Sequence, residues 1–163
     1  MIIRVFLFLA LSFSYFVSAE QISIMSYNLN NLFDAQDDVG KDDKAYLPIE
    51  FKNNDDHIMG CLQVNNSKWR NECLFLDWSE EVVQKKISNI SDLLISMGES
   101  QPDIIAIQEI ENLNVLRMLF SKIEALGYTD FALIEGEDYR GIDNAIISKL
   151  SLIHISEPTR QEA

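Results

Sequence analysis

The order of apolar and polar positions along the chain first predicts four short strands. Apolar residues precede an Asn-rich stretch between residues 21 and 27, so this segment is expected to be a strand that ends at Asn28. A continuous apolar run over residues 104–107 is typical of a strand that is buried on both faces. Two further strands are expected at about 130–134 and 142–148.

Two helices are expected between these strands. The first has the spacing of a capping box at Asp77 and Glu80, ends at Gly98, and carries an apolar stripe at intervals of three and four formed by Val83, Ile87, Ile90, Leu94 and Met97. The second begins near Asn112, ends with a left-handed cap at Gly127, and has an apolar face formed by Leu116, Leu119, Phe120, Ile123 and Leu126. This order of strands and helices predicts an α/β fold.

The segment 34–53 interrupts this pattern. It is polar and acidic, and is expected to form a long surface loop. Its aspartates suggest a calcium site, but the alternating ligand spacing and closing Glu of an EF-hand are missing. A solvated acidic loop is therefore the favoured interpretation of the residues Asp34, Asp37, Asp38, Asp42 and Asp43.

Composition agrees with a folded, acidic protein. Hydrophobic residues make up 47% of the 163 positions, which argues against disorder. The formal net charge of -13 disfavours non-specific binding to nucleic acid, because such binding needs surface Lys and Arg to displace counterions. A local basic groove remains compatible with this charge.

The first 19 residues have the features of a secretory signal peptide. Arg4 is the only charge before an apolar run, and small residues precede an expected cleavage site after Ala19. An uncleaved anchor is the alternative, but the run is short for a membrane span and is interrupted by Ser12 and Ser14. The mature protein is therefore expected to be secreted or periplasmic and to have no transmembrane anchor.

Export changes the expectation for the two cysteines. An oxidising compartment allows a disulfide between Cys61 and Cys73 to persist. Such a bridge closes a short loop and would stabilise the fold by roughly 3 kcal/mol. A zinc site with His57 is the alternative, although the spacing matches no standard four-ligand pattern.

Two polar residues follow predicted strands. Asn28 comes after the first strand and Glu109 after the apolar run, and α/β sheets place ligand sites at the carboxyl ends of strands. A carboxylate at such a position suits Mg²⁺, which takes one or two protein carboxylates and keeps several waters. The alternative for Glu109 is an exposed glutamate with no ligand.

Three segments resemble the endonuclease/exonuclease/phosphatase family: SYNLNNLFD at 26–34, PDIIAIQEIEN at 102–112 and RGIDNA at 140–145. The resemblance runs in order over about residues 22–148. It implies the N-terminal half of a two-sheet α/β sandwich of four layers, with helices outside. Together with the signal peptide, it implies an exported divalent-metal-dependent phosphoesterase, namely a phosphodiester-cleaving endonuclease, with phosphate esters including DNA or RNA as candidate substrates.

The resemblance assigns roles to three residues. It implies that Glu109 holds Mg²⁺, with Mn²⁺ or Ca²⁺ as alternatives, and that the catalytic Asn28 helps to place the metal site or the scissile phosphate. Arg140 would bind the substrate phosphate, because a guanidinium fits that geometry, the alternative being a surface salt bridge. A phosphatase, a lipid phosphodiesterase and a non-catalytic binding domain of the same fold are the alternative functions.

The later motifs of the family, a Gly-Asp-x-Asn turn and a closing Asp-His pair, do not occur in this sequence. The two histidines, His57 and His154, offer no credible general base, so the chain is expected to be inactive by itself. Residues 150–160 (LSLIHISEPTR) resemble the conceptual translation of an adapter used in DNA library preparation, the alternative being a genuine strand. The expected organisation is therefore a signal peptide at 1–19, a partial domain at 20–149 that lacks its C-terminal half, and an artefactual tail at 150–163.

Overall fold

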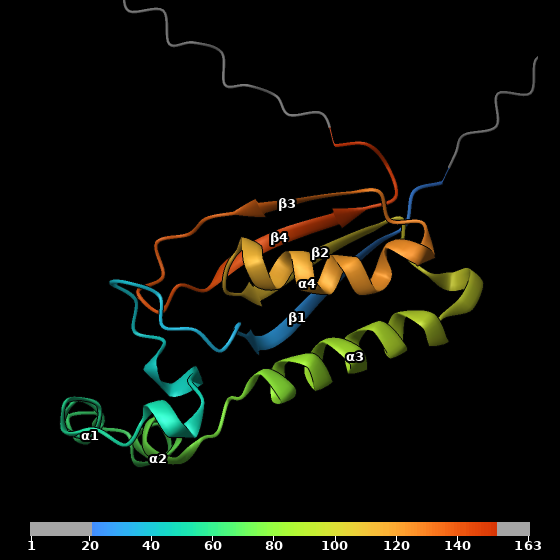
Figure 1. Ribbon diagram of the computed structural model, residues 1–163. Helices are drawn as coiled ribbons and strands as arrows, with labels where there is room; N and C mark the ends of the chain where they lie inside the picture. The colour runs from blue at the N-terminus through green and yellow to red at the C-terminus, as the bar shows by residue number, and fades with distance from the viewer. Residues whose placement is uncertain (1–20, 153–163) are drawn as a thin grey trace, which may run out of the picture.

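The structure, a computed structural model, describes residues 21–152 (Figure 1). The predicted signal peptide and most of the predicted tail lie outside the described residues. One mixed sheet with the strand order β1-β2-β4-β3 forms the centre of the fold. Its strands are β1 (Ile24–Leu32), β2 (Ile104–Ile110), β3 (Asp130–Ile134) and β4 (Asp143–Ser148). The protein is therefore of the α/β class that the sequence predicts.

Strand direction differs across the sheet. β1 and β2 are parallel and are joined by a helical crossover, whereas β4 pairs antiparallel with both β2 and β3. The register is regular from Ile24 opposite Ile104 to Asn28 opposite Gln108. It then shifts before Leu32 pairs with Ile110, so an irregularity lies at the carboxyl ends of the two parallel strands.

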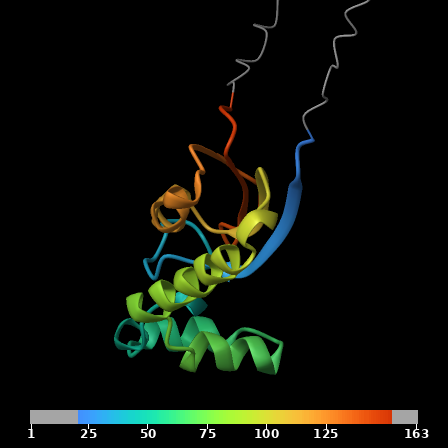
Figure 2. The same ribbon diagram turned by 90° about the vertical axis from the view of Figure 1, so that its right-hand side faces the viewer.

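Two helices, α3 (Glu80–Ser96) and α4 (Leu113–Ile123), lie side by side on one face of the sheet (Figures 1 and 2). The predicted apolar stripes of both helices enter the core, where they meet alternate residues of the strands. Burial of each large apolar side chain stabilises the fold by about 1.5–3 kcal/mol. The centre of this core contains Val83, Ile87, Leu94, Ile105, Ile107, Leu116, Leu119, Ile123 and Ile147.

The opposite face of the sheet is more open than expected. Ile24 and Ile134 at its two edges are 68% and 52% exposed. In the central strand, Ile105 and Ile107 are buried, but Ile104 and Ala106 are only half-buried. The prediction that the run 104–107 is buried on both faces is therefore wrong, because within residues 21–152 the helices of the core cover one face alone.

Two short helices that the sequence analysis missed, α1 (Asp55–Leu62) and α2 (Ser67–Phe75), form a small layer beyond the end of β1 (Figure 1). Asn54 and Asn66 cap them by accepting hydrogen bonds from backbone N–H groups. Their apolar stripes are weak, since each helix buries only one residue, a cysteine. Single-turn 3₁₀ helices lie at Lys44–Tyr46, Ile49–Phe51, Gly98–Ser100 and Glu124–Leu126.

Of the helix caps predicted from sequence, those of α4 are confirmed and that of α3 is wrong. Asn112 caps α4 by accepting the Val115 N–H, and Gly127 is left-handed with φ 92°, as predicted. The predicted capping box at Asp77 is wrong, because Asp77 instead accepts the Ile49 N–H at 3.0 Å and α3 begins after Ser79. Over residues 21–152, no helix is long and apolar enough to span a membrane.

Candidate functional site

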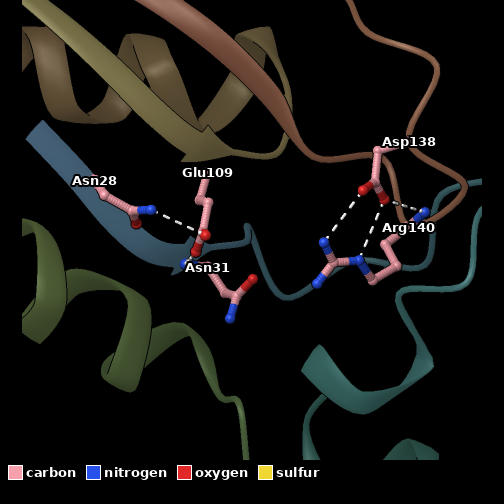
Figure 3. A network of polar contacts seen from close by, with 5 residues as sticks. All are labelled: Asn28, Asn31, Glu109, Asp138 and Arg140. Carbon is pink, nitrogen blue, oxygen red and sulfur yellow. Dashed lines mark hydrogen bonds and ion pairs between the residues drawn. The ribbon is translucent and has the colours of Figure 1, made fainter.

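The parallel pairing of β1 and β2 brings Asn28 and Glu109 together (Figure 3). Asn28 lies opposite Gln108, so Glu109 is one residue beyond it on the neighbouring strand. The Asn28 Nδ2 atom donates a hydrogen bond to the Glu109 Oε1 atom at 2.9 Å. The two residues that sequence reasoning placed at separate strand ends therefore form one site.

The sequence predicted that Asn28 and Glu109 lie just beyond their strands, and this prediction is wrong for both residues. β1 continues from Asn28 to Leu32, and β2 continues from Glu109 to Ile110. The strands bulge at this point instead of ending, since their register shifts between Asn28 and Leu32. The bulge re-aims the side chains, which is a common property of bulges beside functional sites.

The backbone around the bulge is strained. Glu109 has φ 60°, a left-handed conformation that costs a residue with a β-carbon about 1–2 kcal/mol. Asn30 and Asn31 also have positive φ, which asparagine tolerates better than most residues. Such strain persists only where the surroundings hold it, and it is concentrated at functional sites.

The strained turn supplies hydrogen bonds to the carboxylate. The Asn31 N–H donates to the Glu109 Oε2 atom at 3.1 Å, and the Asn28 Oδ1 atom accepts the Asn30 N–H at 2.7 Å. Both oxygens of Glu109 are thus held by neutral donors, and their direction is set by the Asn28–Asn31 turn. We call Asn28, Asn31 and Glu109 the Glu109 site.

A cavity of about 680 Å³ opens beside this site. Asn31 belongs to both, because its side chain lines the cavity while its N–H holds Glu109. The wall also includes Tyr46, Trp78, Lys86 and Arg140, which come from different parts of the chain. A cavity of this size is within the range of small-ligand sites.

Cationic side chains outnumber carboxylates in the lining. Four cations face two carboxylates: Lys44, Lys68, Lys86 and Arg140 against Asp42 and Glu72. This balance is opposite to that of the whole chain, which has a net charge of -13. Lys44 and Lys68 pair with Asp42 and Glu72, so the excess positive charge of the lining comes from Lys86 and Arg140.

Lys86 connects α3 to the strained turn. Its Nζ atom donates to the carbonyl oxygens of Asn30 and Asn31 at 2.6 and 3.1 Å and lies 5.1 Å from the centroid of the Trp78 ring. Burial lowers the pKa of Lys86, and the Glu109 charge opposes that change. Lys86 thus places a positive charge near Glu109 while it supports the turn.

Tyr46 lines the same cavity as Asn31. Burial raises its pKa, and the charge of Glu72 adds to that increase. The Arg140 guanidinium lowers the pKa of Tyr46, and Glu109 raises it. The phenol is therefore protonated at neutral pH and is a hydrogen-bond donor to the cavity region.

Arg140 fits both interpretations that the sequence left open. Its Nε and Nη2 atoms bind the two oxygens of Asp138 at 3.2 and 3.1 Å, which is a surface salt bridge (Figure 3). The same side chain lines the cavity next to Asn31. Since a guanidinium has five N–H donors, the fork on Asp138 leaves others for a second anion.

The donor atoms at the Glu109 site fit a hard cation. Each Glu109 oxygen accepts one hydrogen bond from the described residues, so each keeps a lone pair for a metal. The Asn31 Oδ1 atom is buried and has no hydrogen-bond partner within residues 21–152. Mg²⁺ binds carboxylate and amide oxygens and usually takes few protein ligands.

A second group of carboxylates lies close by and was misjudged from sequence. Asp34, Asp43 and Glu111 are 4%, 1% and 2% exposed, so the interpretation of 34–53 as a solvated acidic loop is wrong for its buried part. Burial raises the pKa of Glu111 to about 9 and that of Asp43 to about 6. The missed signal was the position of Asp34 and Glu111, each directly after an apolar segment.

The two cysteines form a disulfide, Cys61–Cys73, which joins α1 to α2. The His57 Nε2 atom lies 2.9 Å from the Cys73 carbonyl oxygen and 3.2 Å from the Cys61 Sγ atom. Disulfide sulfurs are not thiolates, so this group does not form the alternative zinc site in the oxidised protein. His57 is thus occupied in the α1–α2 layer and is not a base at Glu109.

These contacts define a polar site on an α/β sheet. The arrangement can hold a divalent cation at Glu109 beside a basic cavity. Comparison of the chain with protein-family models, curated proteins and solved structures found no match.

Proposed function

We propose that the chain belongs to an exported, divalent-metal-dependent phosphoesterase of the endonuclease/exonuclease/phosphatase type, with phosphodiesters as substrates. One observation carries the proposal. Glu109 is held in a strained bulge by Asn28 and the Asn31 N–H, at the carboxyl ends of two parallel strands. A strained backbone and two hydrogen-bond donors hold this single carboxylate. This favours a ligand-binding role for Glu109 over that of an exposed glutamate with no ligand.

Glu109 would hold Mg²⁺, and Asn28 would fix the orientation of that carboxylate. Mg²⁺, when bound, supplies positive charge to the phosphoryl oxygens and the leaving oxygen as negative charge develops there. The Asn31 Oδ1 atom offers a further oxygen ligand or an acceptor for a metal-bound water. The hydrogen bonds from Asn28 and Asn31 fix the direction of the carboxylate that would meet the metal.

The cavity would bind the phosphate ester. Arg140 lines the cavity and has N–H donors besides the two that bind Asp138, and Lys86 adds positive charge at the Asn30–Asn31 turn. The protonated Tyr46 phenol can donate a hydrogen bond to a phosphate oxygen. These groups orient the ester beside Glu109, and positioning with charge stabilisation is the main requirement of phosphoryl transfer.

The general base of this reaction would come from outside the described residues. Within 21–152, the only histidine is His57, which contacts Cys61 and the Cys73 carbonyl. The family resemblance supplies a base from a later Asp-His pair, and the proposal includes that this pair lies in a second half. Sequencing of the source DNA across the codons of Lys149 and Leu150, from a library made without transposase adapters, tests this part directly.

Two measurements test the proposed metal site. Mn²⁺ binding to the full chain, followed by electron paramagnetic resonance, should weaken at least about tenfold in Glu109→Gln, since the amide loses the ligand charge. Glu99→Gln is the matched control, because Glu99 is an exposed glutamate at the other end of α3. Hydrolysis of bis(p-nitrophenyl) phosphate and plasmid DNA with MgCl₂ is then measured on the longer protein that the proposal expects, which is encoded by a reading frame that continues past Lys149. We call this longer protein the continuous protein.

Equal Mn²⁺ affinity in Glu109→Gln and in the wild type would remove the metal role of Glu109. Mn²⁺ binding without hydrolysis by the continuous protein, with retained affinity for phosphate esters, would replace the enzyme by a binding domain of the same fold.

A further inference from the structure

Four carboxyl groups meet where the loop after β1 crosses the turn between β2 and α4. Asp34 lies two residues after the end of β1, Asp38 and Asp43 belong to the next loop, and Glu111 directly follows β2. Three of them are at most 4% exposed, and Asp38 is half-buried. We call these four residues the acidic cluster.

Among residues 21–152, only neutral groups bind the acidic cluster. The backbone N–H of Asp34 donates to the Glu111 Oε2 atom, and that of Asp38 donates to the Asp43 Oδ2 atom, both at 2.8 Å. The Asn114 amide donates to the Asp34 Oδ2 atom at 2.8 Å. No lysine or arginine of residues 21–152 forms an ion pair with any member.

One amide is shared among too many acceptors. The Asn112 Nδ2 atom lies 3.1, 3.3 and 3.3 Å from oxygens of Asp34, Asp38 and Glu111. An NH₂ group has two hydrogens, so it cannot satisfy three carboxylate oxygens at full strength. The protein's own donors therefore leave part of the negative charge without a partner.

Two oxygen atoms in the cluster have no hydrogen-bond partner in the described part of the chain. The Asp43 Oδ1 and Glu111 Oε1 atoms are buried and find no hydrogen-bond donor within residues 21–152. Asp43 and Glu111 are 1% and 2% exposed, so bulk water does not compensate them. A buried carboxyl group without a partner either takes up a proton or is kept ionised by a bound cation.

The spacing of the cluster suits a calcium ion. One carboxylate oxygen from each of Asp38, Asp43 and Glu111 lies within 4.8 Å of the others. Ligands at about 2.4 Å from Ca²⁺ lie at most about 5 Å apart, whereas Mg²⁺ requires a tighter octahedron at about 2.1 Å. Ca²⁺ also accepts irregular carboxylate geometry from loops.

We propose that Asp38, Asp43 and Glu111 form a structural Ca²⁺ site that fastens the loop 34–43 to the turn between β2 and α4. Asp34 binds the same turn through its backbone N–H, contacts the first turn of α4 through Asn114, and completes the negative surroundings. The site is separate from the Glu109 site, and it does not depend on the proposed phosphoesterase function.

Calcium binding and thermal unfolding of the full chain test the proposal. The protein is stripped with a chelator, dialysed and titrated with CaCl₂ in a calorimeter. We expect a site with a dissociation constant at or below about 10 µM. At 100-fold excess over that constant, the Tm should rise by about 5–10 °C.

Variants locate the ion. Glu111→Gln and Asp43→Asn should each weaken Ca²⁺ binding at least about 30-fold, because each removes a ligand charge. Asp42→Asn is the matched control from the same loop, since Asp42 is exposed and paired with Lys44. Asp38→Asn serves if a buried substitution prevents folding, because Asp38 is half-buried.

The outcomes separate the two sites. Ca²⁺ binding that persists in Glu109→Gln and is lost in Glu111→Gln supports the proposal, whatever happens to Mn²⁺ binding and hydrolysis. The absence of any Ca²⁺-dependent rise in Tm would overturn it and would mean that the cluster is neutralised by protons. Loss of Ca²⁺ binding in Glu109→Gln with retention in Glu111→Gln would place the ion at the Glu109 site instead.

Discussion

Glu109 and Glu111 are two residues apart at the end of one strand, yet their surroundings differ in every respect. Glu109 is partly exposed, has both oxygens hydrogen-bonded and lies beside a basic cavity. Glu111 is 2% exposed, keeps one oxygen without a partner and is surrounded by other carboxylates. The comparison teaches that one carboxylate is arranged to meet a ligand from solvent, whereas the other needs a permanent internal partner.

The largest expected effect is on catalysis by the longer protein of the proposed function, whose reading frame continues past Lys149. Glu109→Gln should lower kcat for bis(p-nitrophenyl) phosphate by about 100-fold or more, a typical loss when a group that stabilises transition-state charge is removed. Glu111→Gln, assayed with MgCl₂ at a temperature where both proteins are folded, should stay within about threefold of the wild type. A larger loss in Glu111→Gln than in Glu109→Gln would invert the roles assigned to the two glutamates.

Reduction of the Cys61–Cys73 disulfide should affect stability and leave both carboxylate sites intact. The bridge spans a sequence separation of 12 residues, and loss of a bridge of this size costs roughly 3 kcal/mol. Urea unfolding with and without dithiothreitol measures the change in the free energy of unfolding. Since His57 and the cysteines lie in the α1–α2 layer, Ca²⁺ affinity should change by less than about threefold. A parallel loss of Ca²⁺ affinity would show that the layer holds the acidic cluster in place.

A pair of substitutions at each glutamate sharpens the comparison of their backbones. Glu109→Gly should be more stable than Glu109→Ala by about 1 kcal/mol, because only the β-carbon at φ 60° differs between them. At position 111, where no positive φ occurs, the order should reverse by about 0.5–1 kcal/mol, since glycine loses more chain entropy on folding. Urea unfolding of the four variants gives both differences. The same order at both positions would contradict the strained conformation of Glu109.

The smallest expected effect concerns the salt bridge at the cavity rim. Asp138→Asn should change the free energy of unfolding by less than about 0.5 kcal/mol, because the Arg140–Asp138 pair is partly exposed and water screens it. The same substitution frees the guanidinium and should tighten binding of inorganic phosphate, measured by calorimetry, whereas Arg140→Ala should weaken it. Unchanged phosphate affinity in both variants would reduce Arg140 to a surface salt bridge.

Local sequence signals predicted the α3 and α4 helices and the four strands to within a few residues at most ends. Asn112 and Gly127 act within one turn of the chain, so their roles follow from neighbouring residues alone. Asp77 had an equally good local signal, but the Ile49 N–H from a distant turn took its carboxylate. The helices α1 and α2 were missed because their apolar periodicity is weak and their position depends on a disulfide and on contacts with other segments.

At the Glu109 site and the acidic cluster, too, sequence predicted some features and missed those that depend on distant segments. Asn28 and Glu109 could be paired in advance, because parallel strands place their carboxyl ends at one edge of the sheet. The bulge, the left-handed Glu109 and the donors from the turn could not, since they arise from the mismatch of two strands that are far apart in sequence. The burial of Asp43 and Glu111 was equally hidden, because a run of aspartates in a polar segment predicts solvent exposure.

By itself, the sequence determined the α/β order, the apolar faces and the strand ends where chemistry collects, because these depend on periodicity and on residues close together in the chain. The tertiary structure decided which carboxylates share a site and which lose contact with water. Burial and electrostatic compensation are properties of the groups that surround a residue in space. Glu109 and Glu111 are therefore the same residue type in the sequence. They differ chemically only in the folded chain, where Glu109 lies beside donors and a cavity and Glu111 lies among other carboxylates.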